Sequence, residues 1–203
     1  FFAAAGQQIV KLTLEPGVEL RAEPNTSIVV HGSFIARGSA AAPIRLTSNA
    51  SAPRPGDWGG LVFTDTSTDT QFDSGGNYVS GSILEHVIVE YAGADRTLGS
   101  VSIRFSSPFL NYATIRDNDG PGIHVRDGSP SIFNSLIMSN RVGINAFHYE
   151  NVTLKGNIII DNREGGGVFE SFPAGQYQAL SILVGSANVV QNVRKELLQA
   201  AVR

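Results

Sequence analysis

Cysteine is absent from this chain of 203 residues, and charged residues are scarce. The absence of cysteine excludes disulfide scaffolds, cysteine zinc sites and thiol nucleophiles. Charged residues make up 16%, against about 25% in average soluble domains, and the net charge is −3. A nucleic-acid partner is therefore disfavoured, because too few basic residues are available to neutralise a run of phosphates. Disorder is also disfavoured, since 42% of the residues are hydrophobic.

Long apolar runs are lacking as well, so we expect no membrane-spanning segment. The sequence instead contains short runs of β-branched and aromatic residues, separated by Gly, Pro, Asn or Ser. The clearest runs are residues 11–14, 18–21, 27–30, 34–36, 44–47, 61–64, 83–90, 101–105 and 113–116. No helical pattern alternates with them, which excludes a βαβ architecture and predicts an all-β chain.

Asparagines recur along the second half of the chain with a period of about 22 residues, which is in the solenoid range. Two series stand out, with steps of 22 residues in the first and 23 in the second: Asn118, Asn140, Asn162 and Asn111, Asn134, Asn157. Stacked coils bring equivalent side chains to about 4.8 Å, where each amide can bond the next. Asparagine also tolerates the left-handed conformation of a sharp corner. We predict a β-solenoid of about eight coils with three short strands each, in which both series form structural ladders.

Several segments resemble, in order, the coils of a known family. They are residues 12–24, 27–38, 42–48, 55–63, 81–93 and 107–118. They are similar to secreted bacterial and archaeal right-handed parallel β-helix repeat proteins of the pectate-lyase-like superfamily. The resemblance covers roughly residues 9–192 and implies a right-handed parallel β-helix. For function it implies a range: adhesion, surface coats, glycan binding and sometimes polysaccharide cleavage.

The domain organisation that we expect is an N-terminal extension (1–8), the β-helix (9–192) and a short C-terminal helix (193–203), either a cap or a linker. Phe1 and Phe2 make the extension apolar. It either folds onto the first coil or docks on another copy by adding a strand to an open edge. The second alternative predicts homo-assembly through the solenoid ends or the N-terminal segment.

Calcium is the one metal that the resemblance suggests, because polysaccharide lyases on this fold hold Ca²⁺ with clustered carboxylates. Asp117 and Asp161 share a column of the repeat but lie two turns apart, about 10 Å. Asp117 and Asp119 share one corner and are the candidate ligands, although Asp-Asn-Asp-Gly is also an ordinary turn sequence. We otherwise predict no metal, no cofactor and no catalytic residue.

Two aromatic residues are candidates for stacking on a sugar ring: Trp58 and Tyr78. For Trp58 the preferred interpretation is that the ring packs against the flank of the solenoid. Tyr78 ends a long polar excursion, residues 66–78, of the kind that carries recognition on scaffolds. Glu85 and Glu90 flank a strand at odd spacing, which predicts opposite faces and surface positions.

The preferred functional hypothesis is a non-catalytic structural or adhesive module, extracellular or at the cell surface, with self-association as an option. The alternative is a glycan-binding or polysaccharide-cleaving protein, a lyase or a hydrolase. A groove with acids on adjacent turns beside Arg or Lys would favour cleavage, and the repeat alignment predicts none.

Overall fold

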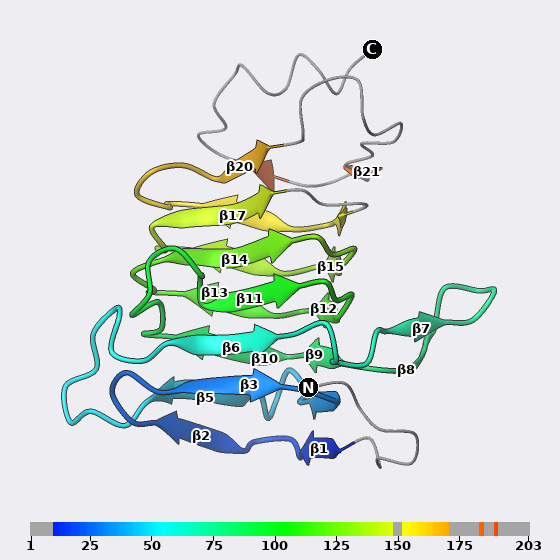
Figure 1. Cartoon of the computed structure of the whole chain (residues 1–203), viewed down its shortest axis with the longest axis horizontal. Coiled ribbons are helices and arrows are strands. Elements are labelled where there is room, and N and C mark those ends of the chain that lie inside the picture. Colours follow the sequence, from blue (N-terminus) through cyan, green and yellow to red (C-terminus); the bar gives the residue numbers. More distant parts are fainter. Residues whose placement is uncertain (1–9, 148–151, 171–182, 185–188, 191–203) are drawn as a thin grey trace.

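The chain is a parallel β-solenoid of about seven turns, seen in a computed structural model that describes residues 10–147, 152–170, 183–184 and 189–190 (Figure 1). Each turn contributes one strand to each of three parallel sheets, except the last, for which the described residues give strands in two sheets. The predicted architecture is confirmed, with about seven turns instead of eight. The expected extension 1–8, with Phe1 and Phe2, and the expected helix 193–203 lie outside the described residues.

The three sheets are named here A, B and C. Sheet A contains, in order, β1 (Lys11–Leu14), β4 (Ser33–Arg37), β9 (Ile83–Glu85), β12 (Phe109–Asn111), β15 (Ser131–Phe133), β18 (Thr153–Lys155) and β21 (Leu183–Val184). Sheet B contains β2 (Glu19–Ala22), β5 (Ile44–Ser48), β10 (Val87–Glu90), β13 (Thr114–Arg116), β16 (Leu136–Met138), β19 (Ile158–Ile160) and β22 (Val189–Val190). Sheet C contains β3 (Ser27–Val30), β6 (Gly60–Phe63), β11 (Val101–Arg104), β14 (Pro121–Arg126), β17 (Val142–Phe147) and β20 (Gly167–Glu170).

One excursion leaves the solenoid between sheets C and A. It is the antiparallel hairpin of β7 (Gln71–Phe72) and β8 (Tyr78–Ser80), which projects to the side in Figure 1. The Phe72 ring packs edge-on against Phe109 of sheet A, with ring centroids 5.0 Å apart. The hairpin is therefore anchored to the outer face of sheet A.

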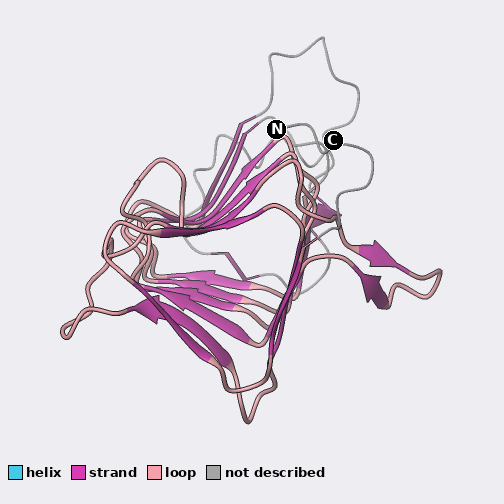
Figure 2. Ribbon diagram, turned by 60° about the horizontal axis from the view of Figure 1, so that its bottom comes forward, coloured by secondary structure: helices cyan, strands magenta, loops and turns pink. Residues whose placement is uncertain are grey.

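The hydrophobic core fills the triangular space between the sheets (Figure 2). Strand residues alternate, so one row of each strand points inward; in β11 these are Val101 and Ile103, both fully buried. Their neighbours in register on the next turn, Ile123 and Val125, are equally buried. Because each turn buries its row against the turns above and below, the stack is stable only as a whole.

The first asparagine series forms the predicted ladder inside the corner between sheets B and C. Asn118 Nδ2 donates to Asn140 Oδ1 at 2.8 Å, and Asn140 Nδ2 donates to Asn162 Oδ1 at 3.1 Å. The three side chains are buried. Each Nδ2 also donates to a backbone carbonyl of the preceding turn, those of Val89, Ile115 and Ile137. Each amide thus forms hydrogen bonds with the backbone carbonyl at the end of a strand, and the three amides are linked to one another by hydrogen bonds.

The second series forms the predicted ladder only in part. The pairing of β12, β15 and β18 repeats every 22 residues, so Asn111 stands opposite Phe133. A step of 23 moves each asparagine to the next position of the coil. Asn134 still donates to Asn111 at 3.0 Å, but Asn157 Oδ1 accepts from the backbone N–H of Ser135.

Residues in the left-handed conformation recur at equivalent corners of successive turns. The corner between sheets B and C has Tyr91, Asp117, Ser139 and Asp161 in this conformation, with φ between 53° and 60°. In this corner the left-handed residue precedes the ladder asparagine, which corrects the expectation that the asparagine itself takes that conformation. Tyr, Asp and Ser all occupy the left-handed position, so this position does not select for asparagine. The asparagine that follows it is selected by the hydrogen bonds between turns, which repeat every 22 residues.

Candidate functional site

The outer face of sheet C carries polar and basic side chains on successive turns. Ser102, His124 and Asn145 stand in register on β11, β14 and β17. They alternate with core residues and therefore point outward. The neighbouring row consists of Arg104, Arg126 and Phe147. These six residues are called the sheet C face below, and their strands face the viewer in Figure 1.

The first row holds polar atoms that are covered but have no hydrogen-bond partner. Ser102 is fully buried and His124 is 7% exposed. Ser102 Oγ, His124 Nδ1 and Asn145 Oδ1 have no partner among the residues that the structure describes. An unsatisfied buried polar group costs about 1–3 kcal/mol, so folded proteins rarely keep several in a row. Such a row is typical of a site that binds water or a ligand.

Two arginines on this face, Arg104 and Arg126, stand near two acids, Asp95 and Asp127. Arg126 approaches Asp127 at 3.5 Å, whereas Arg104 makes no hydrogen bond or ion pair with any described residue. Burial lowers the pKa of His124, and the charges of Arg104 and Arg126 lower it further, against an opposing effect of Asp95. The imidazole is therefore neutral at neutral pH and offers one donor and one acceptor. Phe105, directly after β11, is 60% exposed and adds an apolar surface.

The pKa of His124 predicts a pH dependence of stability. Because it lies below 6.5 in the folded chain, the unfolded chain binds this proton first as the pH falls. We expect the urea midpoint of the wild type to fall more between about pH 7 and pH 5 than that of His124→Gln. Parallel curves for the two proteins would contradict the assignment. Acidic groups titrate in both proteins, so the difference isolates the histidine.

A groove lies beside the sheet C face, at the corner between sheets B and C. Its volume is about 230 Å³, and it is lined by Arg96, Asp119, Arg141, Arg163 and Glu164. Asp119 accepts from Arg96 at 2.7 Å and from Arg163 at 3.0 Å. Arg141 pairs with Glu164 at 2.7 Å. This set of five residues is called the corner groove below.

The corner groove bears on the calcium hypothesis. Both carboxylate oxygens of Asp119 contact guanidinium groups. Burial raises the pKa of Asp119, but the hydrogen bonds and charges of Arg96 and Arg163 outweigh it and the pKa is lowered. Asp117 lies 3.7 Å from Arg116. Positive groups thus surround the proposed ligands, and the described residues contain no cluster of three or more His, Asp or Glu that could hold a metal ion.

Trp58, one of the two predicted stacking residues, is fully buried. Its Nε1 donates to the carbonyl of Glu90 at 2.9 Å, so the ring packs in the solenoid flank and cannot stack on a ligand. Tyr78 is half-buried; its hydroxyl donates to Gly81 O at 2.8 Å, and Arg37 lies 5.4 Å from the ring centroid. A role of Tyr78 in binding stays a prediction.

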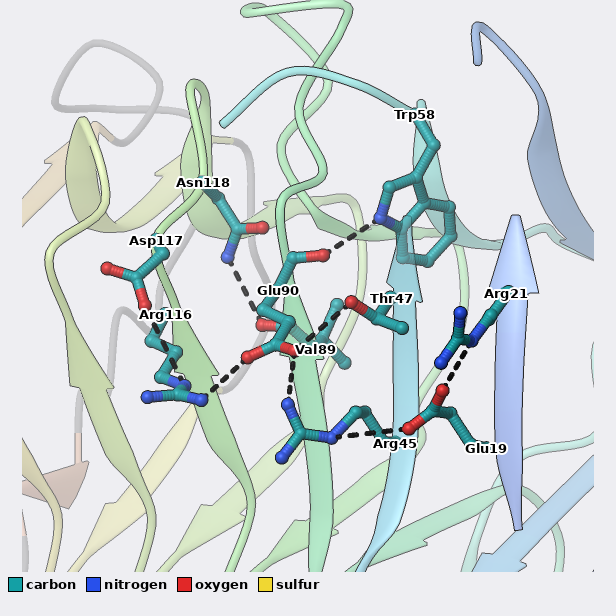
Figure 3. A network of polar contacts seen from close by, with 10 residues as sticks. All are labelled: Glu19, Arg21, Arg45, Thr47, Trp58, Val89, Glu90, Arg116, Asp117 and Asn118. Carbon is teal, nitrogen blue, oxygen red and sulfur yellow. Dashed lines mark hydrogen bonds and ion pairs between the residues drawn. The ribbon is translucent and has the colours of Figure 1, made fainter. Parts of the chain in front are cut away.

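Glu85 and Glu90 belong to two strands, β9 and β10, in different sheets, so the expectation that they flank one strand on opposite faces is wrong. Glu90 alternates with the core residue Val89 and lies on the outer face of sheet B, yet it is 1% exposed and not a surface residue (Figure 3). Its carboxylate accepts hydrogen bonds from Arg45 and Arg116, the latter at 2.7 Å, and from Thr47 Oγ1 at 3.1 Å. The long arginine side chains cover it from the neighbouring turns. Glu90 is therefore a structural ion-pair centre.

Sequence reasoning missed the sheet C face. The signal was present: Gly122-Ile-His-Val and Gly143-Ile-Asn-Ala-Phe align in the repeat, which places His124 and Asn145 in one column. A histidine and an asparagine in one outward column, with Arg126 two residues after the histidine, would have predicted a polar and basic face.

Comparison with known proteins supports the fold. Residues 4–105, half of the chain, match the family model for the pectate-lyase like beta helix domain. No curated protein matches the chain. No solved structure matches it either. In the described residues there is no helix long and apolar enough to cross a membrane.

Proposed function

The chain belongs to the pectate-lyase-like beta helix domain family, and on that premise we propose that it is a non-catalytic adhesive module, extracellular or at the cell surface, that holds a carbohydrate chain against the sheet C face. The observation that carries the proposal is the unpaired polar row of Ser102, His124 and Asn145 beside Arg104. Self-association through Phe1 and Phe2 stays a prediction.

The chemistry of the row matches sugar hydroxyl groups. A serine hydroxyl, a neutral imidazole and an amide each both donate and accept, as sugar hydroxyls do. The exposed ring of Phe105 offers a flat apolar surface of the kind that packs on the C–H face of a sugar. A ligand would first touch Arg104, Arg126 and Phe105. The covered atoms would then become accessible by side-chain rearrangement, which is common on binding.

The acidic groups near this face favour binding over cleavage. Glycoside hydrolysis needs two carboxyl groups, one of them with a raised pKa. Asp95 is the acid whose charge acts on His124. Hydrogen bonds from Thr97 lower the pKa of Asp95, so it is ionised and unsuited to donate a proton. Asp119 and Glu164 are paired with arginines.

Affinity electrophoresis through gels that contain neutral or acidic polysaccharides tests the proposal. We expect at least one polysaccharide to retard the wild type, and the double variant Arg104→Gln/Arg126→Gln to bind it about tenfold more weakly. The matched control is Arg21→Gln on sheet B, whose side chain is 60% exposed and, within the described part of the chain, pairs with Glu19 alone. It should bind like the wild type.

Two results would contradict the proposal. Equal retardation of the wild type and the double variant would remove the sheet C face as the binding surface. Release of unsaturated or reducing ends from any polysaccharide, with or without Ca²⁺, would show that the chain is an enzyme. Circular dichroism of each variant separates loss of binding from loss of folding.

A further inference from the structure

We propose that residues 193–203 form an amphipathic helix that packs on an apolar patch of the outer face of sheet B. The patch consists of four side chains on two neighbouring strands and is called the sheet B patch below: Leu136 and Met138 of β16, Ile158 and Ile160 of β19. This contact is independent of carbohydrate binding on the sheet C face.

The four side chains of the sheet B patch are contiguous and lie on the outside of the solenoid. Leu136 stands in register with Ile158, and Met138 with Ile160. The middle residue of each strand is buried in the core, so alternation places the four on the outer face. Ile158 is 44% exposed, and the other three are partly exposed. Exposed apolar residues scattered singly need no explanation, but a contiguous group indicates an interaction surface.

The earlier turns of the same face carry ion pairs instead. Positions equivalent to those of the patch hold Glu19, Arg45, Glu90 and Arg116, which are paired across the turns (Figure 3). Arg116 stands in register with Met138, so the face changes from charged to apolar between β13 and β16. A surface that becomes apolar within one turn suits a segment that covers only the last turns.

The segment after the last described strand has the matching pattern in its sequence. Val193, Leu197 and Ala201 recur every four residues, which places them on one side of a helix. Polar residues such as Lys195 lie on the opposite side, and Asn192 directly before the segment is a favoured N-cap residue. A helix shorter than about 12 residues is marginal in isolation. This helix is therefore stable only when its apolar side is packed.

The segment starts beside the sheet B patch. β22 pairs with β19, with Val189 in register with Ile158, and ends at Val190. Adjacent strands are about 4.8 Å apart, and one turn of a helix rises about 5.4 Å. A helix that runs back along the solenoid axis therefore places successive apolar residues over successive strands, with Val193 over β19 and Leu197 over β16.

The charges at the border of the patch agree with this placement. Asp161 directly follows β19, is exposed, and makes no ion pair with any residue that the structure describes. Arg194 borders the apolar side of the proposed helix, so it can pair with Asp161 when the helix lies on the patch. A segment that capped the open end of the solenoid instead would leave Ile158 exposed.

Paramagnetic NMR of the full chain tests the contact, and the sequence makes it simple to measure. Met138 is the only methionine, so its isotope-labelled methyl group gives one signal from the patch. The chain has no cysteine, so a nitroxide can be attached at a single introduced one. We expect a nitroxide on Gln199→Cys to broaden the Met138 signal until the nitroxide is reduced. A nitroxide on Ser74→Cys, in the hairpin of β7 and β8, should leave the signal unchanged.

Two variants separate a packed helix from a segment that is merely near the patch. Ile158→Lys places a charge in the patch, and Leu197→Glu places one on the apolar side of the helix. Each should weaken the broadening by the Gln199→Cys nitroxide severalfold, whereas Arg21→Gln, on the charged part of sheet B, should not. Circular dichroism checks that each variant folds.

Three results would overturn the proposal. The first is an unchanged Met138 signal in the full chain with the Gln199→Cys nitroxide. The second is broadening that persists in both Ile158→Lys and Leu197→Glu, because the segment would then be near the patch without packing on it. The third is broadening in a mixture where the isotope label and the nitroxide are on different copies, because the patch would then bind a second copy of the chain.

Discussion

Replacing Asn140 with alanine is expected to lower the free energy of unfolding by about 3 kcal/mol or more. Asn140 is the middle residue of the ladder and is fully buried. Its amide accepts from Asn118 and donates to Asn162 and to the carbonyl of Ile115. Alanine leaves these groups without their partner and opens a cavity between two turns. Urea denaturation followed by circular dichroism measures the effect.

The matched control for Asn140→Ala is Asn134→Gly. Asn134 is exposed, contributes one side-chain hydrogen bond to Asn111, and has φ of 52°. Glycine retains this left-handed conformation without strain. We expect the control to change stability by less than about 1 kcal/mol. Equal losses in the two variants would mean that the buried ladder stabilises the solenoid no more than a surface amide does.

The two asparagine series show how far a repeat predicts a solenoid. Spacing of 22 residues predicted both the fold and the ladder of Asn118, Asn140 and Asn162. Spacing of 23 predicted a second ladder, of which the bond between Asn134 and Asn111 forms and the step to Asn157 does not, because each asparagine moves one position along the coil relative to the strand pairing. Residue identity alone could not reveal this error. Only the column of core residues, such as Leu110 and Ile132, fixes the register.

The candidate site was harder to predict, because its contacts join residues far apart in the sequence. Arg163 reaches Asp119 over two turns, 44 residues away. The loop 93–99 follows no repeat, yet it places Arg96 in the corner groove. Strand alternation could place His124 on an outer face, but not show that it is nearly buried there. Burial in this solenoid depends on loops, whose length and path the period does not determine.

Charged side chains are few in this chain, and on sheet B acidic and basic residues stand opposite each other on neighbouring turns. On the outer face of sheet B, Glu19 stands opposite Arg45, and Glu90 opposite Arg116 on the following turn. Opposite charges at the strand spacing attract, so charged side chains can be stacked in register. The corner groove departs from this rule with Arg141 and Arg163 on consecutive turns. There the charges are compensated across the corner instead, because Arg141 pairs with Glu164 and Arg163 with Asp119.

Replacing Gly60 with alanine is expected to destabilise the chain by about 3–5 kcal/mol, because backbone strain and overpacking add. Gly60 begins β6 with φ of 118°, and a Cβ there would lie 2.4 Å from the carbonyl oxygen of Ser100. That oxygen accepts the backbone N–H of Leu61 at 2.9 Å, so it cannot move without breaking the bond between turns. Thermal melting and the soluble yield measure the effect.

Gly76→Ala is the control that separates the clash at Gly60 from the strain of a positive φ. Gly76 has φ of 80°, but a Cβ at this position would meet no atom within 4 Å. It lies between β7 and β8, in the hairpin that projects from the solenoid. We expect a loss of about 1 kcal/mol from the left-handed conformation alone. The prediction fails if Gly60→Ala loses no more stability than Gly76→Ala. That result would mean that β6 and β11 can move apart by several tenths of an ångström at no cost, which is contrary to close packing of the turns.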